Sequence, residues 1–428
     1  MYPRFSENNL REALLDSPVV LIHGSRQCGK STLARSIGDE LGYRYISFDD
    51  DNQLQAAKAD PMGFVQSLPE KVILDEVQRT PELFLAIKAS VDQNRQPGRF
   101  LLTGSANVLL LPQLADSLAG RMEIMQLRPL AQSEMAGRRP NFLKQLFSAD
   151  FGKNEVHTRL GPELAGILCA GGYPAALARN TAKRRTIWYR DFITSLIQRD
   201  VQDIANIRNL DILPKLLTLA ASQTSRLFVA SELASPFSLS QPTIREYLTL
   251  LEQLFLIEQL QPWHSNRISR LIKTPKLHLT DTGVACALLG IDSDTLWDDK
   301  TLLGQLLETF VFQELRKQAG WHDDTLAFYH FRNKDKVEVD IIIEQGRQIA
   351  GLEVKASATV KAEDFKGLKK LKEACGTAFA CGIVVYDGDS ILPFGDRLFA
   401  VPITKLTQGH DRESRASITT ELPTGTKT

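Results

Sequence analysis

The feature that most constrains the fold is an eight-residue segment between a short apolar run and an amphipathic one. Residues 24–31 read Gly-Ser-Arg-Gln-Cys-Gly-Lys-Ser and match the pattern G-x-x-x-x-G-K-[ST] at every fixed position. Residues 18–23, before it, are an apolar run typical of a buried parallel strand, and residues 31–37 after it have apolar positions at helical spacing. Strand, glycine-rich loop and helix in this order predict a parallel α/β sheet with a phosphate-binding loop at one edge.

The side chains of this loop suit a nucleoside triphosphate, ATP or GTP, of which we predict ATP, bound together with Mg²⁺. The glycines allow backbone N–H groups to curl around the phosphates, and the following helix directs its positive end at the anion. Lys30 would reach the β and γ oxygens, and the Ser31 hydroxyl would ligate Mg²⁺. A redox role for Cys28 is disfavoured, because the variable loop positions tolerate most residues. The predicted nucleotide-binding residues are Gly24, Ser25, Arg26, Gln27, Cys28, Gly29, Lys30, Ser31 and Thr32.

Two carboxylates end a second apolar run, residues 72–74. Alone they could be a helix-capping pair at a strand end. Beside the phosphate loop, Asp75 is expected to hold the Mg²⁺ shell and Glu76 to orient and deprotonate the attacking water. A further strand is expected between the strands of the two motifs. Together these features favour hydrolysis over passive nucleotide binding.

Hydroxyl side chains end the strand predicted at residues 100–102. The carboxyl ends of parallel strands face one crevice, so Thr103 or Ser105 could contact the γ-phosphate or its water. Ordinary turn residues are the alternative. Arg121 is a candidate arginine finger on a neighbouring subunit's nucleotide, and a solvated arginine at a helix end is the alternative reading.

The middle of the chain is mostly helical and then changes pattern. A helix over 241–254, preceded by a short helix and followed by strands over 255–260 and 276–279, is the outline of a winged helix. Residues 263–276 carry four Lys or Arg and no acid, which is typical of a wing that tracks phosphates, and Lys183-Arg184-Arg185 is an earlier basic cluster. We predict DNA contact here. The alternatives are a protein-binding module and ordinary solvated surface.

A group of charged residues recurs near the C-terminus on predicted strands. Glu353 and Lys355 are two apart and share a strand face, and a turn at residues 345–347 brings Asp340 close to them. Asp340 and Glu353 could hold Mg²⁺, with Glu308 as a further ligand, while Lys355 orients the attacking hydroxide. A surface hairpin with alternating charges is the alternative.

Taken together, these motifs resemble the bacterial and archaeal AAA+ superfamily ATPases that join an N-terminal P-loop domain to a C-terminal domain of unknown function. That C-terminal domain in turn resembles the PD-(D/E)xK nucleases. The resemblance implies that residues 103–107 are a sensor region and that Arg121 is a candidate finger. It also implies that Asp340, Glu353 and Lys355 fall on metal-dependent cleavage positions. The segments that carry it are HGSRQCGKST, VILDEVQ, LLTGSAN, LAGRMEIMQLRPL, VEVDIII and GLEVKAS.

Charge and composition limit the class of protein. The chain has 51 Lys plus Arg and 51 Asp plus Glu, which excludes a uniformly basic nucleic-acid-coating protein but permits a local basic site. The five cysteines are scattered and without zinc spacing. No basic-apolar leader pattern and no apolar run of about 18 residues are present. We therefore expect a reduced cytoplasmic protein without a membrane segment.

These observations predict an α/β protein that binds and hydrolyses ATP, binds DNA, and uses its nucleotide state to control DNA remodelling or processing, with a possible metal-dependent nuclease site. A homo-oligomer such as a ring is expected, because an arginine acting in trans needs a neighbour. One alternative is a nucleotide-switched scaffold for protein interactions in defence or stress, with an inert nuclease-like domain. The other is a structure-specific DNA nuclease in which the ATPase is only a gate. The predicted parts are an AAA+ P-loop domain with a parallel sheet (1–135), a helical region (136–215), a winged helix (216–295), a restriction-endonuclease-like α/β domain (296–407) and a disordered tail (408–428).

Overall fold

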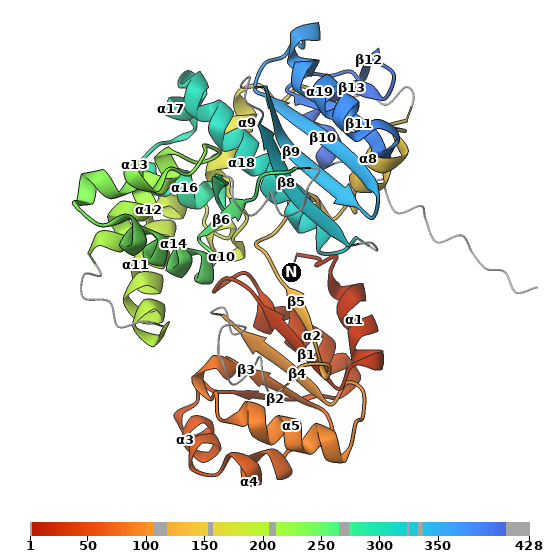
Figure 1. Ribbon diagram of the computed structural model, residues 1–428. Coiled ribbons are helices and arrows are strands. Elements are labelled where there is room, and N and C mark those ends of the chain that lie inside the picture. Colours follow the sequence, from red (N-terminus) through yellow and green to blue (C-terminus); the bar gives the residue numbers. More distant parts are fainter. Residues whose placement is uncertain are drawn as a thin grey trace, which may run out of the picture.

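The fold was obtained as a computed structural model that describes residues 2–105, 118–152, 157–204, 211–264, 274–322, 325–332 and 337–407. The P-loop domain (red to orange in Figure 1) is joined to a larger part made of helices and a second sheet. The predicted tail at 408–428 and most of the predicted wing, residues 265–273, lie outside these ranges, as does the end of the predicted sensor region.

The first sheet confirms the predicted parallel α/β arrangement. Its five strands run in the order β2-β3-β4-β1-β5 and all pair in parallel. Strand β4 therefore lies between the strands that lead into the two nucleotide motifs, as expected. Every residue of the three central strands is buried, which explains their continuous apolar sequences. The strands are β1 (Val19–His23), β2 (Arg44–Ser47), β3 (Val72–Asp75), β4 (Phe100–Gly104) and β5 (Met122–Gln126).

Helices cover both faces of this sheet, each over a separate core. Along β1, Val19 and Leu21 pack on one face, and Val20 and Ile22 on the other, as the two-residue period of a strand requires. The first core contains side chains of α3 (Asp51–Ala59), α4 (Pro61–Gln66) and α5 (Leu83–Gln93), and the second contains side chains of α1 (Glu7–Asp16) and α2 (Lys30–Leu41).

The middle of the chain is helical and contains a two-stranded antiparallel sheet. The predicted start of the helix at residue 241 is confirmed: Pro242 lies in its first turn, and the Ser240 hydroxyl accepts a hydrogen bond from the Thr243 N–H. The elements are α7 (Gln132–Ala136), α8 (Phe142–Ser148), α9 (Pro162–Ala170), α10 (Pro174–Leu177), α11 (Ala182–Ile204), α12 (Ile212–Ser222), α13 (Ala230–Ala234), α14 (Gln241–Gln253), β6 (Ile257–Leu260), β7 (Lys276–Leu279), α16 (Thr282–Leu289) and α17 (Ser293–Asp298).

The second large sheet has six strands in the order β12-β13-β11-β10-β9-β8. The expected order of helix, three strands, helix and strand is present, and two further strands, β12 and β13, follow it. Strands β9 and β10 form the predicted hairpin, in which Gln345 pairs with Gln348. The elements are α18 (Lys300–Ala319), β8 (Leu326–Arg332), β9 (Glu338–Gln345), β10 (Gln348–Lys355), α19 (Lys366–Cys375), β11 (Phe379–Tyr386), β12 (Leu392–Gly395) and β13 (Leu398–Pro402).

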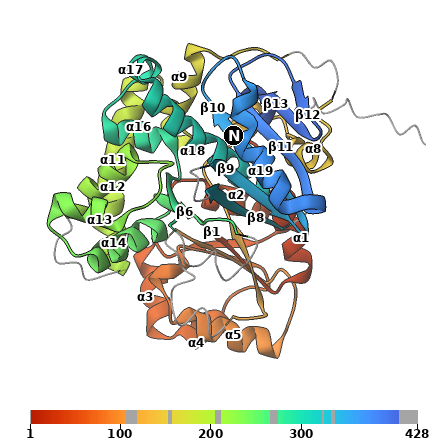
Figure 2. The same ribbon diagram turned by 45° about the horizontal axis from the view of Figure 1, so that its top comes forward.

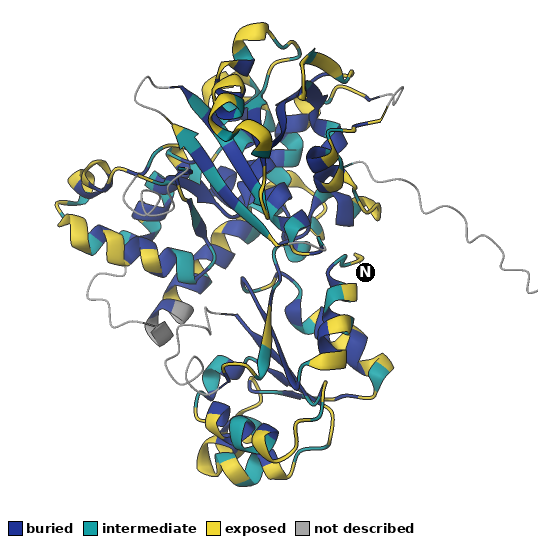
Figure 3. Ribbon diagram, turned by 45° about the vertical axis from the view of Figure 1, so that its right-hand side comes forward, coloured by how far each residue is buried: buried dark blue, intermediate teal, exposed yellow. Residues whose placement is uncertain are grey.

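The helical middle part and the six-stranded sheet share one hydrophobic core. It runs from Phe142 on α8 through Phe312 on α18 to Leu406, and the Phe151 and Phe399 rings meet edge to face at 5.6 Å. Helix α18 lies between the helices and the sheet (Figure 2), and the large strands of the sheet show dark blue and teal in Figure 3. The predicted boundary at residue 296 therefore runs through a continuous core. Among the described residues, no helix has the length and apolarity needed to cross a membrane.

Candidate active site

The P-loop follows β1 and owes its shape to glycines. At Gly24 the backbone φ is 151°, and a Cβ there would lie 2.1 Å from the carbonyl oxygen of Leu127, so no other residue fits without a shift of the chain. Gly29 has a φ of 105° and precedes the first residue of α2. The amino end of this helix thus faces the loop, where its backbone N–H groups favour an anion.

Lys30 is the first residue of α2 and folds back over the loop. Its Nζ donates hydrogen bonds to the carbonyl oxygens of Gly24 (3.1 Å) and Ser25 (2.9 Å), and the residue is 4% exposed. An ammonium held only by two neutral carbonyls can exchange them for phosphate oxygens, to which hydrogen bonds are stronger because both partners are charged. Lys30 Nζ is therefore placed to make the predicted contact with a phosphate bound in the loop.

The predicted Mg²⁺ ligands face each other across two elements. The Ser31 hydroxyl donates to Asp75 Oδ1 at 2.8 Å, and Asp75 ends β3, where it is 4% exposed. A hydroxyl and a carboxylate oxygen side by side fit Mg²⁺, which prefers hard oxygen ligands and completes its shell with water and phosphate. The Tyr45 hydroxyl donates to the other oxygen of Asp75 at 2.6 Å, and burial, with help from Asp75, raises the pKa of Tyr45 to about 12.

Glu76 is held by the end of the neighbouring strand β4. It adopts a left-handed backbone conformation (φ 59°, ψ 46°), which is uncommon for a residue other than glycine. Its Oε2 accepts hydrogen bonds from Ser105 Oγ (2.9 Å) and from Gln78 Nε2, and its N–H donates to Thr103 Oγ1 at 3.3 Å. Thr103 also donates to Asp75 Oδ1. The structure thus brings together Ser31, Asp75, Glu76, Thr103 and Ser105, five residues that the sequence proposed separately.

Two residues of this site, Tyr45 and Gln78, were not predicted from the sequence. Tyr45 lies on a predicted strand whose carboxyl end faces the crevice, and Gln78 lies inside the VILDEVQ segment, two residues after Glu76. Neither residue type signals catalysis by itself, so only the three-dimensional pairing reveals them.

Arg121 lies at the amino ends of the parallel strands, whereas the P-loop lies at their carboxyl ends. It precedes β5, whose first residue, Met122, pairs with Val19 at the start of β1, whereas the P-loop follows the end of β1. Its Nε donates to Asp92 Oδ1 at 2.6 Å. Arg121 is therefore not part of the site in its own chain, and its action on a neighbour's nucleotide stays a prediction.

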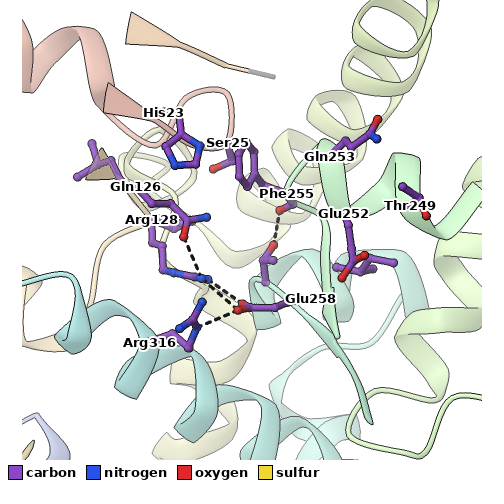
Figure 4. A pocket seen from close by; sticks show the side chains of 14 residues that line it. His23, Ser25, Gln126, Arg128, Thr249, Glu252, Gln253, Phe255, Glu258 and Arg316 are labelled. Carbon is purple, nitrogen blue, oxygen red and sulfur yellow. Dashed lines mark hydrogen bonds and ion pairs between the residues drawn. The ribbon is translucent and has the colours of Figure 1, made fainter. Parts of the chain in front are cut away.

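A cavity of about 390 Å³ opens beside the first residues of the P-loop (Figure 4). Its wall includes Arg128, whose guanidinium lies 2.8 Å from Glu258, and Arg316, whose Nε donates to the same carboxylate at 2.8 Å. Burial lowers the pKa of His23 in this wall to about 4, with a further contribution from Arg128. The lining residues are His23, Ser25, Gln126, Leu127, Arg128 and Pro129 from the P-loop side and Thr249, Glu252, Gln253, Phe255, Ile257, Glu258, Thr280 and Arg316 from the rest of the chain.

The C-terminal residues predicted to form a second site do lie near one another. Asp340 Oδ2 accepts a hydrogen bond from the Val354 N–H at 3.0 Å, and Lys355 Nζ lies 3.8 Å from Glu353 Oε2. Burial, followed by the charge of Asp340, raises the pKa of Glu353 well above its usual value. The predicted hairpin geometry is therefore present.

Lys276 corrects the prediction of a basic wing. It was counted among the basic residues of 263–276 that would track phosphates, but it is 2% exposed. Its Nζ lies between Glu308 (2.8 Å), Glu338 (2.7 Å) and Asp340 (3.1 Å). Burial alone would lower the pKa of Lys276, but these three carboxylates raise it well above its ordinary value. An ammonium that is paired in this way is not available to DNA.

The geometry also bears on the predicted metal ligands Glu308, Asp340 and Glu353. Within the described ranges, no group of three or more His, Cys, Asp or Glu side chains is placed to hold one metal ion. Their role as metal ligands therefore stays a prediction.

Among the family models that match this chain, one has a description that indicates a function. A family model described as an AAA domain matches residues 16–136, which confirms a P-loop ATPase domain there. Two models described only as domains of unknown function, DUF8612 and DUF4143, match residues 162–295 and 303–406.

Full-length relatives and solved structures were also found. The uncharacterized proteins Rv2008c of Mycobacterium tuberculosis and Mb2031c of Mycobacterium bovis are each 29% identical over 399 residues, covering 93% of this chain and 82% of theirs. The Walker-type ATPase PABY2304 of Pyrococcus abyssi has a TM-score of 0.43 and 16% identity, covering 67% of this chain and 96% of that one. The Thermotoga maritima RuvB Holliday junction branch migration motor has a TM-score of 0.28 and 17% identity, covering 59% of this chain and 88% of that one.

Proposed function

We propose that this chain hydrolyses ATP and uses the nucleotide state to control how its P-loop domain contacts the rest of the chain. The observation that carries the proposal is the connected set at the carboxyl edge of the parallel sheet. Ser31 contacts Asp75, and Ser105 holds Glu76, on strands that flank one crevice beside the P-loop. A residue placed to bind metal and a residue placed to accept a proton are both needed for hydrolysis.

In this proposal each side chain has one task. Bound Mg²⁺ would neutralise developing charge on the phosphates. Lys30 would leave the carbonyls of Gly24 and Ser25 for phosphate oxygens. Glu76 would accept a proton from the attacking water, and Ser105, which already donates to Glu76, would orient that carboxylate.

The cavity beside Ser25 supports a link between nucleotide and the larger part of the chain. A ligand that extends from the P-loop into this cavity would touch α14, β6 and α18 as well as the P-loop domain. The Glu258 carboxylate, bonded to both Arg128 and Arg316, is the charged contact at this junction. Ligands that bind these surfaces differently in two arrangements would shift the balance between the arrangements.

For the partner we propose DNA, bound through α14 and neighbouring basic surface. The order α13, α14 and the antiparallel pair β6-β7 supports a winged helix. Gln241, Arg245 and Glu246 are exposed on α14, and Lys183 and Arg184 are exposed at the start of α11. Exposed cations of this kind suit phosphate contacts.

A second candidate is a nucleotide-switched scaffold for protein interactions, again as a homo-oligomer such as a ring in which Arg121 acts in trans. The pairing of Lys276 with Asp340 and Glu308 favours it over nuclease action, because the carboxylates already hold a cation of the chain itself.

One experiment tests both candidates. ATP hydrolysis and binding to linear, forked and four-way DNA are measured with ATP, ADP and a non-hydrolysable analogue over a salt series. A DNA-binding ATPase should lose DNA affinity steeply with salt, and Arg245→Ala should weaken DNA binding while ATP hydrolysis in the absence of DNA is unchanged. Hydrolysis without DNA binding in any nucleotide state favours the scaffold. No hydrolysis at all would refute the main proposal.

A further inference from the structure

The interface between the two-stranded sheet and the six-stranded sheet contains one fully paired ammonium. Lys276, the first residue of β7, has three N–H donors on Nζ, and three carboxylates from other elements lie within 3.1 Å of it. Glu308 comes from α18, whereas Glu338 and Asp340 come from β9. Every donor of the ammonium can therefore be satisfied by a carboxyl oxygen.

Two further cationic side chains lie beside these carboxyl groups. Arg332 NH1 lies 3.9 Å from the second oxygen of Glu338, and Lys355 Nζ lies 3.8 Å from Glu353. Each of the four carboxyl groups, Glu308, Glu338, Asp340 and Glu353, thus lies within 3.8 Å of a cationic side chain of the same chain. A divalent ion between Glu308 and Asp340 would have to displace the Lys276 ammonium, because like charges at contact distance in a buried site repel strongly.

Neighbouring contacts hold Lys276 in this place. The Trp263 N–H donates to the His330 carbonyl at 2.6 Å, and the His330 N–H donates to the Gln261 carbonyl at 3.0 Å. Trp263 Nε1 also donates to Glu344 Oε1 at 2.6 Å. The chain that continues from β6 is therefore bonded to the edge strand β8, and β7 is paired with β6 along its whole length.

We propose that the C-terminal carboxylate cluster binds the Lys276 ammonium in place of a divalent metal ion, and that this ion pair joins the β6-β7 sheet to the C-terminal sheet. The cluster is then a joint between two parts of the chain. Removal of the ammonium converts it into a divalent cation site. This inference does not depend on ATP hydrolysis.

The first test needs no change at Lys276. Mn²⁺ binding to the nucleotide-free protein is titrated by electron paramagnetic resonance, in a background that carries Asp75→Asn so that the P-loop carboxylate does not contribute. We expect no Mn²⁺ site that depends on Asp340, so Asp340→Asn should change Mn²⁺ affinity less than about twofold while it lowers the melting temperature by about 5 °C or more. One bound Mn²⁺ that Asp340→Asn removes would overturn the proposal.

The second test removes the lysine. Lys276→Met keeps an unbranched side chain, one atom shorter and without the ammonium. It should raise Mn²⁺ affinity at least about tenfold, and addition of Asp340→Asn should abolish the gain. The control is Lys183→Met, at an exposed position, which should leave Mn²⁺ binding unchanged. If Lys276→Met folds, as judged by circular dichroism, and gains no Mn²⁺ affinity, the conversion is refuted. If it does not fold, the first test still decides whether the native cluster binds metal.

Discussion

The hydroxyl of Ser31 lies 2.8 Å from a carboxylate oxygen of Asp75, although one residue lies in the first turn of a helix and the other ends a strand further along the chain. This contact joins the two halves of the nucleotide motif. It exists because β1 and β3 run parallel on either side of β4, so the segments that follow them reach the same edge of the sheet.

Glu76→Gln should reduce the rate of ATP hydrolysis by about 100-fold or more, because the amide cannot accept the proton of the attacking water. ATP affinity should remain near that of the wild type. Hydrolysis is measured by phosphate release and affinity by fluorescent nucleotide binding. Glu82→Gln, at an exposed position nearby, is the matched control. Survival of hydrolysis in the Glu76 variant would remove Glu76 from its proposed role.

Ser31→Ala should weaken binding of Mg²⁺-ATP by about tenfold, since one hard oxygen ligand is lost. Binding of ATP in the presence of EDTA should change much less. The two affinities are compared by calorimetry. Ser36→Ala, on the exposed side of the same helix, should behave as the wild type. An equal loss with and without Mg²⁺ would contradict the assignment of Ser31 as a metal ligand.

Glu258→Gln should lower the free energy of unfolding by about 3 kcal/mol, because Arg128 and Arg316 would lose their shared carboxylate. Burial opposes ionisation of Glu258, but the two arginines hold its pKa at about 2. The ion pairs are thus present above about pH 4.5 and are lost as the pH falls toward 2. Urea denaturation at pH 7 measures the effect, with the exposed Glu246→Gln as control. Equal stability of the two variants would show that the junction contributes little.

Stability should fall as the pH is lowered below 6.5, in part because His278 is fully buried. Burial, together with the charge of Lys276, lowers its pKa in the folded protein from 6.5 to about 3. The unfolded chain therefore takes up a proton that the folded chain does not, and each pH unit below 6.5 costs up to about 1.4 kcal/mol. His278→Gln should reduce this dependence between pH 6.5 and 5 in urea denaturation. An unchanged slope would mean that His278 can be protonated in the folded state.

The nucleotide site could be predicted because its residues follow strand ends and carry a fixed spacing. Asp75, Glu76 and Thr103 needed only the parallel order of the strands to be brought together. Tyr45 and Gln78 could not be predicted in the same way, because their role depends on which side chain lies opposite them.

The prediction that Lys276 belongs to an exposed basic wing was wrong for a related reason. Within residues 263–276 it appeared as one basic residue among several, and local charge favours exposure. Its burial results from carboxylates on α18 and β9, which follow later in the chain. Long-range pairing of this kind leaves no pattern in the neighbouring sequence.

The packing of α8 against β10 and β11 has a consequence for synthesis on the ribosome. Helix α8 emerges near the start of the helical middle part, yet the strands that bury Phe142 and Phe147 are made near the end. Until β11 appears, the packing around these rings is incomplete, and the nascent chain carries an exposed apolar surface that a chaperone could bind. The P-loop domain, whose two cores close within its own residues, can be complete long before that moment.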